Sequence, residues 1–439
     1  MSTILVMGYE LPSMSNGAIE ARSYRTLQFV EPLLAEGHQV CLVVSHQDNQ
    51  MDVSQSLTSA LSYHRVNLQA YGWRELFRPL LRRFNPDSIL AITFNSCLRA
   101  TRLPTSIPIW MDIYGDKLAE IQIAQFTQNT NRGYRTMLHH VMWVLKGGDV
   151  YSTCGTPQKY ALVGQLGMAS RLNRQTLGYE FVHAVLPGAS TKVSLHRQGQ
   201  PLRGTLVPEN SFIVLWCGGY NVWADIETLF QALTQAMELD PRIVFVSVGA
   251  GVKFAQNDTY EHFLTKIKAS SFRDRFYMLG WRPASEVPDY YRQADVGINL
   301  DALHYETVLG TRTRLVEMMS YGLPVITSLG CELSHIIQTR SLGLTFPIGD
   351  GEMLSAHIVT LANNPELRKG VADKSQLFVS QELSFSETTR AFQEWIRQPY
   401  HAPDRLRKKT SFDLRDAEYF LRSKARRLLW RLWALERGE

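Results

Sequence analysis

A strand, a charged loop, a helix, a tight turn and a second strand follow one another between residues 294 and 328. Two short apolar runs, Val296–Leu300 and Leu323–Thr327, have the length of strands, and the second is entered through Gly322 and Pro324. The segment between them, 311–321, has the spacing of an amphipathic helix. The pattern predicts a βαβ unit, whose loop lies at the carboxyl end of a parallel strand, where open α/β sheets bind ligands.

The loop and helix of this unit carry both cations and carboxylates. A helix N-terminus favours negative charge, and its free amides bind phosphate. Two cations and two carboxylates at such a point suit a ligand with a diphosphate at one end and hydroxyls at the other. We therefore expect one site made by His304, Glu306, Thr311, Arg312, Arg314 and Glu317.

Strand and helix patterns alternate along most of the 439 residues, in two series that start near Ile4 and Phe212. A chain of this length is too long for one core, so two domains are expected. The predicted fold is α/β, with two doubly wound Rossmann-like domains facing a cleft. The expected boundaries are 1–190 for the first domain, 191–210 for a linker rich in Gly and Pro, 211–382 for the second domain, 383–399 for a helix that crosses back, and 400–439 for a basic tail.

Composition excludes several classes of protein. With 45% hydrophobic and 20% charged residues, disorder over most of the chain is not expected. No apolar run approaches the roughly 18 residues that a membrane span needs, and the N-terminus has no signal-peptide pattern. Five widely separated cysteines favour a reducing cytoplasm and argue against disulfides or a zinc site. The first loop lacks the GxGxxG spacing, so a dinucleotide cofactor is not expected.

Three acidic residues follow a predicted strand of the first domain. Asp112, Asp116 and Glu120 are four apart, so they share one face if this segment is helical. Asp112 directly follows the apolar residues of the strand, which favours a functional role. For Asp116 and Glu120 a solvated helix face is an equally good interpretation, and Asp112 could also cap the helix.

The last 40 residues carry the whole net charge. Residues 400–439 contain 11 Lys/Arg and 6 Asp/Glu, which gives the +5 of the complete chain. The basic character therefore belongs to a tail, which argues against nucleic-acid binding. Within 411–435 leucines recur every seven residues beside arginines and two tryptophans. Such a helix can lie on an anionic membrane, dock on protein or pair with another chain.

The second half resembles the nucleotide-sugar domain of the group 1 glycosyltransferases of the GT-B fold. The resemblance rests on the strand ends at Gly218, Gly219 and Gly249, the run LGWRPASEVPDYYRQADVGIN with Trp281 and Arg282, and the run VEMMSYGLPVITS. In the family a Glu lies five residues before the Gly of a G-x-P-V-I turn, and Glu317 has this spacing to Gly322. The resemblance implies that Glu317 binds the ribose of a nucleotide. These residues are expected to line the donor site.

Two departures from the family pattern change the roles that are expected of other residues. The family has a second Glu eight positions before the ribose Glu, where this chain has Leu309, so Glu306 or His304 is expected to take its place. The family's Arg and Lys after the Gly-Gly strand are absent from YNVWAD, so Arg312 or Arg314 is expected to hold the diphosphate, although either arginine could instead pair with Glu306 or Glu317.

The resemblance implies a cytoplasmic hexosyltransferase, retaining and metal-independent, that moves a sugar from a nucleotide diphosphate to a glycan, lipid or small molecule. Asp112, Glu306 and Arg312 are the candidate catalytic residues, and Asn16 and Gly17 are candidate substrate contacts on the facing loop. No cofactor is expected beyond the nucleotide-sugar co-substrate. Contact with the inner face of the plasma membrane is a hypothesis that concerns the tail. Two alternatives stay open: a silent subunit that activates a partner enzyme, and a nucleotide-sugar epimerase.

Overall fold

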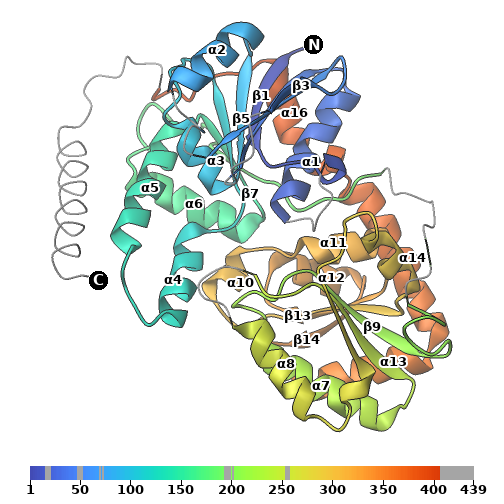
Figure 1. Ribbon diagram of the computed structural model, residues 1–439. Helices are drawn as coiled ribbons and strands as arrows, with labels where there is room; N and C mark the ends of the chain where they lie inside the picture. Colours follow the sequence, from blue (N-terminus) through green and yellow to red (C-terminus); the bar gives the residue numbers. More distant parts are fainter. Residues whose placement is uncertain are drawn as a thin grey trace, which may run out of the picture.

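Two α/β domains lie against each other, with an N-terminal and a C-terminal sheet (Figure 1). The computed structural model describes residues 1–14, 21–46, 53–68, 71, 74–191, 199, 202–252 and 258–405. Both sheets consist mainly of parallel strands, and helices cover both faces of each. This is the doubly wound arrangement that the alternating sequence pattern predicts.

The N-terminal sheet has the strand order β3-β4-β2-β1-β5-β6-β7-β8, and only β3 runs antiparallel to its neighbour. Its strands are β1 (Thr3–Gly8), β2 (Gln39–His46), β3 (Val53–Ser56), β4 (Leu61–Asn67), β5 (Ser88–Ile92), β6 (Ile109–Ile113), β7 (Val150–Thr153) and β8 (Val182–Ala184). The helices between them are α1 (Ala21–Ala35), α2 (Arg74–Phe84), α3 (Thr93–Ala100), α4 (Lys117–Thr127), α5 (Tyr134–Gly147) and α6 (Thr156–Met168).

The C-terminal sheet is parallel, in the order β11-β10-β9-β12-β13-β14. Its strands are β9 (Phe212–Cys217), β10 (Ile243–Val248), β11 (Phe276–Gly280), β12 (Val296–Asn299), β13 (Val325–Leu329) and β14 (Leu344–Pro347). Its helices are α7 (Ile226–Leu239), α8 (Thr259–Ala269), α9 (Val287–Gln293), α10 (Tyr305–Leu309), α11 (Thr313–Ser320), α12 (Glu332–Arg340), α13 (Gly351–Asn363) and α14 (Pro365–Glu382).

Alternate side chains of each central strand enter two different cores. In β9, Val214 and Trp216 pack on one face of the sheet, while Ile213 and Leu215 pack on the other. All four are at most 1% exposed. Burying each such aliphatic side chain stabilises the fold by about 1.5–3 kcal/mol, so both faces must stay covered. Because both faces are covered, the ends of the strands provide the surface for ligands.

The end of the chain returns to the N-terminal domain. The short helices α15 (Phe385–Thr388) and α16 (Arg390–Arg397) follow α14, and α16 covers the N-terminal sheet (Figure 1). Phe392 and Trp395 pack on Trp110 of β6, with ring centroids 5.3 and 5.6 Å away. The buried carboxylate of Asp149 accepts a hydrogen bond from the Ala402 amide at 3.0 Å, which ties the chain down beyond the helix.

Two predicted segments are only partly described. Of the linker 191–210 the structure describes 191, 199 and 202–210, and of the tail 400–439 it describes 400–405. No helix within the described ranges is both long and apolar enough to cross a membrane.

Candidate functional site

Two glycine turns lie against each other at the carboxyl ends of β9 and β10. Gly218 and Gly249 have φ of +110° and +146°, in the region that favours glycine. A Cβ on Gly249 would lie 2.0 Å from the carbonyl oxygen of Gly218, and one on Gly219 would lie 2.2 Å from Cγ2 of Val252. A side chain at Gly219 or Gly249 would meet these atoms, so the close approach of the two turns requires glycine there.

Arg314 supplies a cation to these turns from the start of α11. Its guanidinium lies over the Trp216 ring, 4.4 Å from the centroid, and its Nη2 donates to the Gly219 carbonyl at 3.0 Å. Nη1 is buried and has no hydrogen-bond partner among the described residues. Burial lowers the pKa of the Arg314 guanidinium, because the charged form loses water. A buried, incompletely paired cation beside glycine turns is suited to bind an anion.

Glu317 lies three positions further along α11. The Tyr291 hydroxyl donates to its Oε2 at 3.1 Å, and the Tyr24 hydroxyl, from α1 of the N-terminal domain, also bonds to the carboxylate. Oε1 is buried and has no partner within the described part of the chain. Burial raises the pKa of Glu317 to about 7. The carboxylate can thus accept a further hydrogen bond, as the predicted ribose contact requires.

Arg312 faces a different direction and is fully engaged. Its Nε donates to Asp301 Oδ2 at 2.7 Å, and its Nη2 donates to Glu306 Oε2 at 2.8 Å. Arg312, Asp301 and Glu306 are 5–6% exposed, and Trp223 covers the guanidinium at 5.7 Å. Burial raises the pKa of Glu306. The pairing that the sequence left open is therefore present, and it replaces the expectation that Arg312 faces phosphate and that Glu306 is free for catalysis.

Of the remaining predicted donor residues, Trp281 lies against the turn at Gly219. The Trp281 ring passes 3.4 Å from the Cβ position of Gly219, and Arg282 Nε and Thr311 Oγ1 are buried without a partner among the described residues. His304 precedes α10, and burial lowers the pKa of its imidazole. Within the predicted cluster Arg312 is thus paired with Asp301 and Glu306, whereas Arg314 and Glu317 make other contacts. Arg314 still lies close enough to Asp301 and Arg312 for their charges to act on it.

Asp112 is a partner in a buried ion pair. Its Oδ2 and Oδ1 accept from Arg25 Nε and Nη2 at 2.9 and 2.7 Å, and Ser152 Oγ donates to Oδ1 at 2.6 Å. Both Asp112 and Arg25 are at most 2% exposed. Both carboxylate oxygens of Asp112 thus have partners inside the N-terminal domain, which replaces the expectation that Asp112 is a catalytic residue. Asn16 and Gly17 lie outside the described residues.

The three acidic residues do not share one helix face. Asp112 belongs to β6, while Asp116 caps α4 by accepting hydrogen bonds from the amides of Leu118 and Ala119 at 3.0 and 2.9 Å. Glu120 pairs with Lys117 on the same helix. The cap that the sequence offered for Asp112 is therefore made by Asp116 instead. Asp116 is 6% exposed and the Glu120 side chain 18%, so neither lies on a fully solvated helix face.

Hydrogen bonds join the two domains beside the site. The Tyr114 hydroxyl bonds to Thr313 Oγ1 at the start of α11, and the amide of Thr156 donates to Glu332 Oε2 at 2.5 Å. Together with the bond between Tyr24 and Glu317, these contacts hold the two domains against each other.

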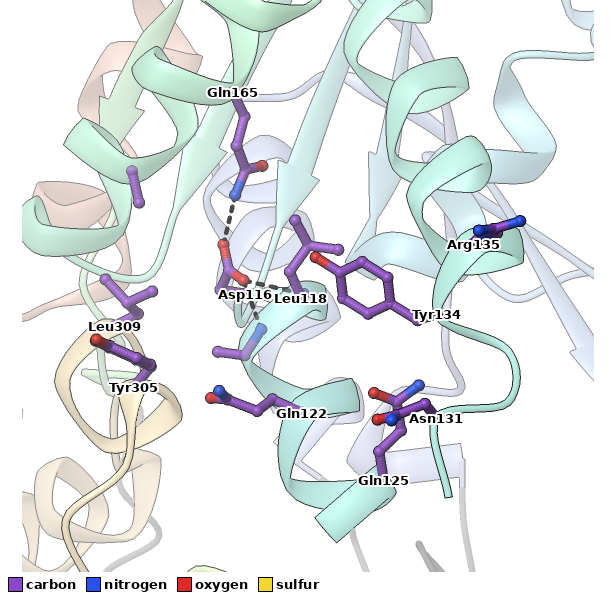
Figure 2. A pocket seen from close by; sticks show the side chains of 12 residues that line it. Asp116, Leu118, Gln122, Gln125, Asn131, Tyr134, Arg135, Gln165, Tyr305 and Leu309 are labelled. Atoms are coloured by element: carbon purple, nitrogen blue, oxygen red, sulfur yellow. Dashed lines mark hydrogen bonds between the residues drawn. The ribbon is translucent and has the colours of Figure 1, made fainter. Parts of the chain in front are cut away.

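A cavity of about 670 Å³ lies between α4, α5 and α6 of the N-terminal domain and α10 of the C-terminal domain (Figure 2). Its size is within the range of small-molecule sites, and α10, which carries Glu306, forms part of its wall. The residues that line it are Asp116, Leu118, Ala119, Gln122, Gln125, Asn131, Tyr134, Arg135, Ala161, Gln165, Tyr305 and Leu309.

Sequence reasoning missed Arg25, Tyr24, Tyr291 and Asp301. A signal existed for a partner of Asp112, because an aspartate at the end of a buried strand needs a donor. Nothing in the local pattern indicated which of the distant residues supplies it. Among the described residues no group of three or more His, Cys, Asp and Glu is placed to hold a metal ion.

Comparisons with known proteins bear on both halves. Residues 211–364 match the family described as glycosyl transferases group 1. No curated protein matched the chain. Sucrose-phosphate synthase from Thermosynechococcus elongatus superimposes with a TM-score of 0.69 at 16% identity, over 91% of this chain and 99% of its own. HepE of Anabaena, solved in complex with UDP-glucose, gives 0.65 at 14% identity, over 90% of this chain and 100% of its own.

A third structure is that of WaaG, a glycosyltransferase involved in lipopolysaccharide biosynthesis. It superimposes with a TM-score of 0.57 at 14% identity, over 88% of this chain and 98% of its own. At such identities these likenesses show the fold. The predicted pair of facing Rossmann-like domains is therefore confirmed along most of the chain.

Proposed function

We propose, on the premise that residues 211–364 belong to the group 1 glycosyltransferases, that this chain transfers a sugar from a nucleotide-diphosphate donor to an acceptor at the N-terminal domain. The observation that carries the proposal is the pair of incomplete polar groups on α11. Arg314 Nη1 and Glu317 Oε1 are buried without partners among the described residues, and they lie near the glycine turns. A diphosphate on Arg314 and a ribose hydroxyl on Glu317 would satisfy both groups.

The chemistry follows from where charge develops. The bond between the anomeric carbon and the diphosphate breaks, the acceptor oxygen forms a new bond to that carbon, and the acceptor hydroxyl loses its proton. The leaving diphosphate gains negative charge as its bond breaks. Arg314 is held in place before the reaction by the Trp216 ring and the Gly219 carbonyl, and such a preorganised donor stabilises the transition state. Asp301, Arg312 and Glu306 hold the loop before α11 in place.

UDP-glucose is the first donor to test, because HepE was solved in complex with it. Retention and metal independence are part of the proposal. Both are measured with the wild-type protein, by the anomeric configuration of the product in NMR and by transfer in the presence of EDTA.

Titration calorimetry with UDP, together with sugar release from UDP-glucose, tests the site itself. We expect Arg314→Leu to weaken UDP binding by about 10- to 100-fold, since a hydrogen bond to a charged group contributes roughly 1.5–3 kcal/mol. Arg314→Lys keeps the charge and should recover part of the affinity. Arg340→Leu is the matched control, because this arginine is 58% exposed and pairs with Glu382 on the surface.

Two results would contradict the proposal. If the wild-type protein binds no nucleotide diphosphate and releases no sugar from any donor in a screen, the chain is not a transferase. Nucleotide binding without any sugar release would favour the silent subunit. The absence of a cation near Gly219, which motivated that alternative, is removed by the contact of Arg314.

A further inference from the structure

The lining of the α4–α5–α6–α10 cavity has an unusual chemistry for a site so close to the residues proposed to bind a diphosphate. Four of its side chains are neutral amides, namely Gln122, Gln125, Asn131 and Gln165. An amide group carries both donors and acceptors, so it complements a hydroxyl, which is also both. The Nε2 atoms of Gln125 and Gln165 already donate, to the Arg132 carbonyl at 3.1 Å and to Asp116 at 2.8 Å, and their Oε1 atoms remain as acceptors. A ligand rich in hydroxyls matches this lining better than one rich in charge.

The two charged residues of the lining do not make it an ion site. Asp116 is 6% exposed, and its oxygens accept from two backbone amides and, at 2.8 Å, from Gln165 Nε2 (Figure 2). Its charge is thus stabilised by neutral donors of the protein itself. Arg135 is the only cation among the residues lining the cavity and lies at an exposed position. One exposed cation is a weak basis for binding a phosphate or a carboxylate.

Two tyrosines stand on different sides of the cavity. Tyr134 begins α5 in the N-terminal domain, and Tyr305 begins α10 in the C-terminal domain (Figure 2). They are 41% and 68% exposed. A tyrosine ring offers a flat apolar face and a polar tip, which suits the C–H face and the hydroxyl edge of a sugar ring.

The position of the cavity connects it to the donor site. Tyr305 and Leu309 flank Glu306 on α10, and Glu306 is tied through Arg312 to the start of α11. The same short segment therefore forms one wall of the cavity and the approach to Arg314 and Glu317. A chain of sugars whose end reaches the donor would lie with its remaining units along this wall.

We infer that the cavity binds neutral sugar units of an oligosaccharide acceptor, at a distance from the hydroxyl that is glycosylated. The inference rests on the proposed transferase function and adds the class of acceptor. It predicts that the acceptor is a neutral glycan and not a sugar phosphate or a free lipid phosphate.

The test is binding of the full-length protein to a printed array of neutral, sulfated and phosphorylated oligosaccharides. We expect binding to neutral members of at least three units. We expect Gln122→Ala and Tyr305→Ala each to weaken binding to these glycans by tenfold or more. Both side chains are exposed, so the variants should fold. Tyr160→Ala is the control, since Tyr160 is an exposed tyrosine of α6, 69% accessible, that does not line the cavity.

Array binding needs no donor, so it fails independently of catalysis. If no neutral glycan binds, or if both variants bind as the wild type does, the inference is wrong even when sugar release from UDP-glucose is intact. Binding confined to phosphorylated glycans and lost in Tyr305→Ala would likewise overturn it. If neutral glycans bind at the cavity but no nucleotide binds and no sugar is released, the proposed transfer fails and the binding site remains.

Discussion

Glu317 should lower the stability of the protein at neutral pH, and its replacement by Gln measures by how much. Burial raises the pKa of this carboxyl from 4.5 to about 7, a gap of about 2.5. At 1.36 kcal/mol for each pH unit, the folded state disfavours the ionised form by ~3 kcal/mol. The side-chain amide introduced by Glu317→Gln keeps an acceptor for the Tyr291 hydroxyl and carries no charge, so we expect this variant to be more stable than the wild type.

The sign and the pH window follow from linkage. The folded state holds the proton more tightly than the unfolded state, so ionisation costs stability as pH rises from 4.5 to about 7. The gain in Glu317→Gln should therefore be about 1 kcal/mol at pH 5 and ~3 kcal/mol at pH 8. The latter is an upper figure, because water that enters the site reduces the cost.

Urea unfolding at pH 5 and pH 8 checks this, with thermal melts as a second probe. Glu382→Gln is the control, because Glu382 is 49% exposed and pairs only at the surface, so its effect should be small at both pH values. A stability gain that is equal at the two pH values, or a loss at pH 8, would refute the reasoning.

The same Glu317→Gln variant should bind UDP at least tenfold more weakly, since a charged acceptor forms the stronger hydrogen bond. Wild-type affinity for UDP should fall as pH drops below 7.

The structure leads to three more expectations. Asp112→Asn leaves Arg25 buried without its counter-charge, so it should destabilise the protein by about 3–5 kcal/mol in urea unfolding, and a loss under 1 kcal/mol would mean that the pair is open to water. Gly249→Ala places a methyl group against the Gly218 carbonyl and should weaken UDP binding in calorimetry, whereas unchanged affinity would show that the turn adjusts freely. Because the tail carries the net positive charge, the full chain should float with anionic liposomes more than a chain that ends at residue 405, and equal flotation would exclude a membrane role for the tail.

The fold was predictable because every level of the sequence agrees with it. The central strands are uninterrupted apolar runs, as strands buried on both faces must be, and helices of the right length separate them. The glycines after β9 and β10 were found for a related reason, since a strand that ends in glycine beside a ligand site indicates close approach of the backbone. These features are local, and local features can be read from one sequence.

The partner of Asp112 could not be read in the same way. Arg25 lies 87 positions earlier, in a helix whose sequence looks amphipathic, and it meets Asp112 only because β6 and α1 are brought together by the sheet order. An aspartate at a strand end is equally typical of a catalytic base and of a buried ion pair. The two roles differ in whether a cation reaches the carboxylate, which is a property of the three-dimensional packing.

The two arginines of the run GTRTR, Arg312 and Arg314, show the limit of what can be predicted from the sequence alone. Arg314 belongs to α11, whereas Arg312 precedes the helix and has non-helical backbone angles, φ −127° and ψ 89°. Helical spacing therefore does not fix the direction of the Arg312 side chain relative to that of Arg314. Which arginine meets the carboxylates depends on the segment after β12, where Asp301 and Glu306 of α10 both contact Arg312, while Arg314 contacts the glycine turns. The charges available to a ligand are those that the fold has not already paired, and the pairing is settled only when distant elements meet.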